Sequence, residues 1–224
     1  MTFAQRRVAV AALKAVLDAL LASGINAESQ DGATLRQLCG ALSADAVNQV
    51  QASTFGTPLR ACFAAATAAG ATFAGMDRVR QAAQGVTATD LPVQRVAQTA
   101  ARLALAEIAR ILAATTFTSR QDIDAALAQV NAAFVPAEDF AAAQFNNVVW
   151  RALLASHGDV VRDLTARARP LPRIVSYSFG TRMPLLTLAN RLYGDASRAD
   201  ELLAENCDTV HPLFMPPSGR ALSA

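Results

Sequence analysis

Two short stretches near the C-terminus decide how the chain can be interpreted. They are Leu188-Ala189-Asn190-Arg191-Leu192-Tyr193-Gly194-Asp195 and Ala199-Asp200-Glu201-Leu202-Leu203-Ala204-Glu205-Asn206. The first is typical of a short helix that stops at Gly194, because glycine tolerates the positive φ of a helix C-terminus. Asp195 can cap the helix that follows, and Asn206 can close it in the left-handed region. The two stretches therefore predict a pair of short helices.

Segments of strand character flank this helix pair. Residues 173–179 alternate and are rich in β-branched and aromatic side chains, which predicts a strand that ends at Gly180. A proline-rich loop at 211–219 leads to a second possible strand at 220–223. The predicted order within 173–224 is β-α-α-β, and its expected core residues are Leu188, Leu192, Leu202 and Leu203.

The segment Arg169-Pro170-Leu171-Pro172 separates this region from the rest of the chain. Its prolines favour extended backbone, so we predict a linker at 168–172 between a helical region at 1–167 and a small domain at 173–224. Several arginines give the segment a local positive charge. Either a solvated linker or contact with an acidic partner surface would account for them.

The first three quarters of the chain have helical periodicity. Alanine supplies 51 of the 224 residues, so facing helices can approach closely while each buries little area. We predict about six helices joined by short loops, which favours an antiparallel bundle. A bundle stabilised by partner subunits and a self-sufficient monomer both remain open. The expected ranges are 3–22, 31–51 with a break near 40–43, 57–84 with possible kinks at 70 and 75, 90–114, 120–133 and 136–165. Ser119 followed by Asp122 predicts a cap at the start of 120–133.

Composition excludes several classes of function. The formal charge is +2, which gives no argument for a nucleic-acid binder, and we expect DNA binding to be weak at physiological salt. No apolar run is long enough for a membrane span. Charged residues interrupt the N-terminal apolar stretch, which argues against a secretory signal peptide. The sequence therefore predicts neither a membrane protein nor a secreted precursor.

No residue pattern indicates catalysis or a metal. Cys39, Cys62 and Cys207 lack paired spacing, so buried reduced thiols are expected rather than a disulfide framework or a zinc site. His157 and His211 lie far apart without a nucleophile nearby, and a position at a helix end or in a loop is expected for both. We predict no enzyme activity and no cofactor.

The C-terminal order and residues resemble the LysM module. Tyr193, Gly194 and Asp195 stand at the end of its first helix, and Leu202 and Asn206 fit its second helix. The resemblance implies that these five residues set the fold of a small domain. The fold class it predicts is mainly α: an alanine-rich helical bundle followed by a β-α-α-β LysM-like domain.

A wider resemblance begins at Pro170, includes His211-Pro212 and covers about 55 residues. This part is similar to the C-terminal end of the DNA circulation family of Mu-like phages, whose members belong to tails and baseplates. The resemblance implies a structural virion protein, made in the host cytoplasm and present in several copies, with other tail proteins as partners. The alternative is a peptidoglycan-binding module.

The loops beside the expected glycan groove, at 180–184 and 208–219, depart from the LysM pattern. They hold Met183, Phe214 and Met215, and thioethers and an aromatic ring suit a protein partner better than a sugar. We therefore predict a docking surface that includes these residues. A role of Phe214 and Met215 in the core of so small a domain is the other possibility.

Overall fold

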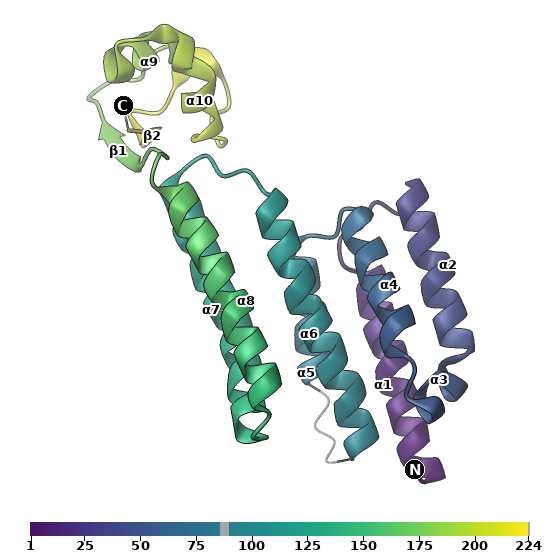
Figure 1. Ribbon diagram of the computed structural model, residues 1–224. Coiled ribbons are helices and arrows are strands. Elements are labelled where there is room, and N and C mark those ends of the chain that lie inside the picture. The colour runs from purple at the N-terminus through teal and green to yellow at the C-terminus, as the bar shows by residue number, and fades with distance from the viewer. Residues whose placement is uncertain (86–89, 224) are drawn as a thin grey trace. The chain divides into compact units, whose positions relative to one another are not determined.

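The computed structural model describes residues 1–85 and 90–223 (Figure 1). Among these residues the chain is mainly helical, with ten α-helices and one two-stranded sheet. They fall into two compact units, which we call the N-terminal unit (1–115 and 131–160) and the C-terminal unit (116–130 and 161–224). In the described part of the chain, no helix combines the length and the apolar character that a membrane span requires.

Six helices of the N-terminal unit pack mainly in sequential or nearby pairs. Helix α5 packs on α6, α2 packs on α4, and α1 contacts both α5 and α6. The large side chains at the centre of this packing include Leu13, Leu59, Phe63 and Met76, all fully buried. The six helices are α1 (Phe3–Leu21), α2 (Gln30–Ala44), α3 (Ala46–Ala52), α4 (Gly56–Ala68), α5 (Phe73–Gln84) and α6 (Leu91–Ala114).

The predicted helix at 57–84 is wrong, because two helices occupy this range. Gly70 adopts a positive φ of 88° between them, and the Thr72 side chain caps α5 by accepting from the Gly75 N–H at 3.0 Å. Alanine on both sides of the break hides it from the periodicity, so the glycine was interpreted as a kink. The break expected near 40–43 lies instead at Asp45, between α2 and α3.

Helix α7 (Arg120–Ala143) begins where the sequence predicts. Ser119 Oγ accepts from the Asp122 N–H at 3.2 Å, and the Asp122 carboxylate accepts from the Ser119 N–H at 3.0 Å. These reciprocal bonds confirm the predicted cap. Burial opposes ionisation of Asp122, but the hydrogen bonds from Ser119 and Thr118 outweigh it and lower its pKa.

The expected helix start at Pro136 is wrong. Helix α7 runs through Pro136 and ends at Ala143, and α8 (Asn147–Ala168) starts after a turn in which Phe145 has a φ of 52°. A proline within a helix removes one backbone hydrogen bond, four residues back at Ala132. Ala132 and Pro136 are both exposed, so water can reach the backbone there and the helix tolerates the proline.

The C-terminal domain, residues 173–224, contains the small sheet and two α-helices in the order β-α-α-β (Figure 1). Strand β1 (Ile174–Ser178) pairs antiparallel with β2 (Ser218–Leu222), and Tyr177 lies opposite Gly219. Between them come α9 (Leu185–Tyr193), a 3₁₀ turn at Ala196–Arg198, α10 (Ala199–Ala204) and a second 3₁₀ turn at Pro212–Phe214. Leu188 and Leu202 are buried in its core, and Leu192 and Leu203 pack against them.

The cysteines divide into two kinds. Cys39 on α2 and Cys62 on α4 are buried and free, as expected, and a hydrogen bond between the two thiols together with burial raises the pKa of Cys39. Cys207 is exposed, so the expectation that all three are buried is wrong. It lies in the loop between α10 and β2, where the domain has too little core to cover it.

Candidate functional site

Three residues at the end of α9 hold the C-terminal domain together. Gly194 ends the helix with a φ of 70°, and Asp195 accepts from the backbone N–H and the hydroxyl of Ser197, each at 2.8 Å. The hydroxyl oxygen of Tyr193 accepts from the Leu222 N–H at 3.2 Å and so ties α9 to β2. Burial raises the pKa of Tyr193. All three residues therefore stabilise the fold of the domain.

Asn206 ties the end of α10 to the same strand, β2. Its Nδ2 donates to the carbonyls of Leu202 and Arg220, both at 2.7 Å, and its Oδ1 accepts from the Arg220 N–H at 3.0 Å. The neighbouring Gly219 lies so close that an added Cβ would collide with Asn206 Oδ1 and would reach the Tyr177 hydroxyl at 2.6 Å. Asn206 and Gly219 therefore fix where the loop between α10 and β2 begins and ends.

Two loops of this domain lie side by side and form an open groove. The Met215 N–H donates to the Met183 carbonyl at 3.0 Å, and the Phe179 N–H donates to the Pro217 carbonyl at 2.6 Å, which joins the loops at 179–184 and 205–217. The groove has a volume of about 760 Å³. Its charged lining is balanced in sign, with Arg182, Arg220, Glu205 and Asp208.

Three exposed apolar side chains lie on the second loop. We call them the loop ridge: Val210, Leu213 and Phe214. Their exposed fractions are 100 %, 57 % and 64 %. His211 shapes the ridge, because its Nδ1 accepts from the Leu213 N–H at 3.1 Å and its ring lies 6.0 Å from that of Phe214. Three apolar side chains are thus exposed on one short loop, and two of them, Val210 and Phe214, also line the groove.

The three residues of the predicted docking surface are placed differently. Phe214 is exposed on the loop ridge, whereas Met215 has an exposed fraction of 0 % and belongs to the core. Met183 is half-buried and packs against the same core. Of the three, Phe214 alone has a largely exposed side chain. Val210 and Leu213 were missed, although an apolar run inside a proline-rich loop was the signal that pointed to them.

The base of the C-terminal domain is tied to the ends of α7 and α8. Arg120 donates to the carbonyls of Leu171 at 3.0 Å and Arg169 at 2.8 Å, and Gln121 bonds both the N–H and the carbonyl of Ile174. The segment predicted as a linker therefore has its carbonyls paired with α7.

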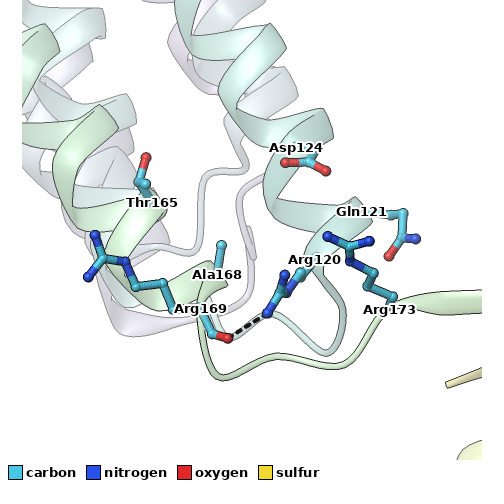
Figure 2. Close-up of a pocket in the computed structure, with 7 residues that line it drawn as sticks. All are labelled: Arg120, Gln121, Asp124, Thr165, Ala168, Arg169 and Arg173. Atoms are coloured by element: carbon cyan, nitrogen blue, oxygen red, sulfur yellow. Dashed lines mark hydrogen bonds between the residues drawn. The ribbon is translucent and has the colours of Figure 1, made fainter. Parts of the chain in front are cut away.

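These contacts border a cleft of about 510 Å³, lined by Arg120, Arg169, Arg173 and Asp124 among others (Figure 2). In Figure 2 the Arg173 side chain runs back toward Arg120, and the Arg169 side chain points away toward Thr165. The three arginines therefore do not converge on one point.

The remaining candidates have structural partners. His157 lies within α8 rather than at a helix end; its ring contacts Glu138 and Asn131, both at 2.8 Å, and stacks on Phe134. No group of three or more metal-binding side chains occurs among residues 1–85 and 90–223.

A scan against protein-family models finds no match, and a search among curated proteins finds none either.

Proposed function

We propose that the chain is a structural component of a phage tail or baseplate, in which the C-terminal domain docks onto neighbouring tail proteins. The observation that carries this proposal is the loop ridge, where Val210, Leu213 and Phe214 are exposed together. Exposed apolar side chains that cluster on an ordered loop are typical of protein contacts. Burying a side chain of the size of Phe214 against a partner stabilises a complex by about 1.5–3 kcal/mol.

The resemblance to the LysM module and to the phage family supports the same proposal. The β-α-α-β order is the one that the resemblance implies. Tyr193, Gly194, Asp195, Leu202 and Asn206 each stabilise the domain internally. Residues that carry the resemblance thus account for the fold, which leaves the two loops to determine the partner.

Peptidoglycan binding is the second candidate function. It is favoured by the polar side of the groove, where Arg182, Asp208, His211 and Arg220 could donate and accept hydrogen bonds with a sugar chain. The loop ridge argues for docking instead, because its three side chains offer no polar groups to a glycan.

The test measures binding of the full chain to each protein encoded by the genes that neighbour its own, tail proteins among them if the proposal holds. Phe214→Ala should weaken the affinity for its partner at least tenfold, as expected of an interface anchor. Unfolding of the domain should change little, because the Phe214 side chain is already in water. Leu186→Ala is the matched control, since Leu186 is equally exposed at 62 % but lies on α9 outside the loop ridge.

Two results would contradict docking. One is an unchanged affinity in the Phe214→Ala variant for every tail protein that binds. The other is saturable binding to purified peptidoglycan that Phe214→Ala leaves intact, together with no affinity for tail proteins, which would favour the second candidate.

A further inference from the structure

A polar cleft lies in the N-terminal unit, which does not contain the loop ridge. It lies between one face of α6 and the end of α7, and its volume is about 260 Å³. We call it the α6 cleft. It is lined by Leu91, Gln94, Arg95, Gln98, Thr99, Arg102, Phe140, Ala141, Gln144 and Asn146.

The charge of the α6 cleft is of one sign. Arg95 and Arg102, two turns apart on the same face of α6, are both among the lining residues, and no aspartate or glutamate is. The other polar groups are amides and a hydroxyl, which can donate hydrogen bonds to an anion. Such a lining suits a negatively charged ligand.

Arg102 gives an independent reason to expect a ligand. Its Nε atom is buried and has no hydrogen-bond partner. Burial lowers the pKa of Arg102, and no neighbouring acid opposes that effect. A buried nitrogen of a charged group without an acceptor is destabilising, and native structures rarely keep one without a function or a bound group.

We propose that the α6 cleft binds an oxyanion, a carboxylate or a phosphate, with Arg102 and Arg95 as its charged donors. Its small volume fits one such group and is below that of usual pockets for drug-sized ligands. The oxyanion can be a free small molecule or the acidic side chain of a neighbouring protein. The inference does not depend on the proposed function, because the C-terminal domain takes no part in it.

The experiment follows unfolding of the full chain by the fluorescence of Trp150, the sole tryptophan, which lies on α8 in the N-terminal unit. Inorganic phosphate, succinate and a short poly-glutamate peptide are each titrated at constant ionic strength, with sodium chloride and a poly-glutamine peptide as blanks. At least one anion should raise the melting temperature in a saturable manner. Saturation by phosphate or succinate indicates a free ligand, and saturation by the peptide alone indicates a partner side chain.

Variants assign the effect to the cleft. Arg102→Gln should weaken the saturable binding at least tenfold, and Arg60→Gln, at an exposed position on α4, should leave it unchanged. Without anion, Arg102→Gln should melt at the same temperature as the unchanged chain or higher, which also shows that the variant folds. The proposal is overturned if no anion saturates, if Arg102→Gln responds as the unchanged chain does, or if that variant melts at a lower temperature without anion.

Discussion

Gly219→Ala should destabilise the C-terminal domain selectively. The added Cβ would collide with Asn206 Oδ1 and lie 2.6 Å from the Tyr177 hydroxyl and 2.8 Å from its ring carbon Cζ. Tyr177 is a core residue and cannot swing out freely. The methyl group therefore forces either strain in the core or a displacement of Asn206.

Both routes give a similar magnitude. Overpacking a core costs about 1–3 kcal/mol. Displacing Asn206 removes three hydrogen bonds, to Leu202 and twice to Arg220, at about 1 kcal/mol each. We expect a loss of about 2–3 kcal/mol, which is a large part of the stability that a domain of this size has.

The chain carries its own reporters for this experiment. Its two tyrosines, Tyr177 and Tyr193, both lie in the C-terminal domain, whereas Trp150 lies in the N-terminal unit. In urea, the transition followed by near-ultraviolet tyrosine signals should move to lower denaturant by about 2 M, for a slope near 1 kcal/mol per molar. The transition followed by tryptophan should stay in place.

Gly180→Ala is the control, because a Cβ at Gly180 meets no atom within 4 Å. It should leave both transitions unchanged. The steric argument would be refuted if Gly219→Ala left the tyrosine transition within about 0.5 kcal/mol of the unchanged chain, the range of an ordinary surface substitution.

Two further predictions concern the helices. Gly75→Ala should destabilise the N-terminal unit by about 3 kcal/mol or more, measured by tryptophan fluorescence, because the added Cβ would collide with the backbone carbonyl of Ser23. Gly40→Ala lies in open space on α2 and should stabilise the unit by about 0.5–1 kcal/mol. Equal effects of the two substitutions would contradict the reasoning. Asp122→Asn should weaken the α7 cap by about 1 kcal/mol near neutral pH. Folding lowers the pKa of Asp122, so its contribution is fully present above the usual aspartate range and is lost as pH falls through the lowered value. The difference in stability between the two proteins should therefore shrink progressively as pH falls below about 4. A difference that stays constant into strong acid would rule this out.

The sequence predicts individual caps and glycine stops of this fold well, and it predicts where long helices break less well. Gly194 and the cap at Ser119 are set by residue type, and both are found where expected. Pro136 and Gly70 mislead because the outcome depends on surroundings: the proline lies on an exposed face that water can solvate, and the glycine sits in an alanine run without periodic contrast. Propensity is a local quantity, and tertiary context overrides it.

The candidate sites show the same division. Phe214 was found from residue type, but the burial of Met215, its neighbour, depends on the bridge to Met183 and could not be derived from the sequence. Arg95 and Arg102 lie two helical turns apart, a spacing visible in the sequence. Their importance becomes apparent only in the folded chain, where residues 140–146 line the same cleft and the Arg102 Nε is buried.

The C-terminal domain separates the residues that hold its fold from those that meet its surroundings. Asn206 and Gly219 fix the two ends of the loop, and the Met183–Met215 bridge fixes a point between them. The residues left over, which include Val210 and Phe214, project outward without core contacts to lose. Substitution on the loop ridge should therefore alter what the domain binds and change its free energy of unfolding little. Substitution of Asn206 or Gly219 should lower the free energy of unfolding without changing the surface that binds. A domain built this way can keep one fold while the loop between these two residues is adapted to a different partner.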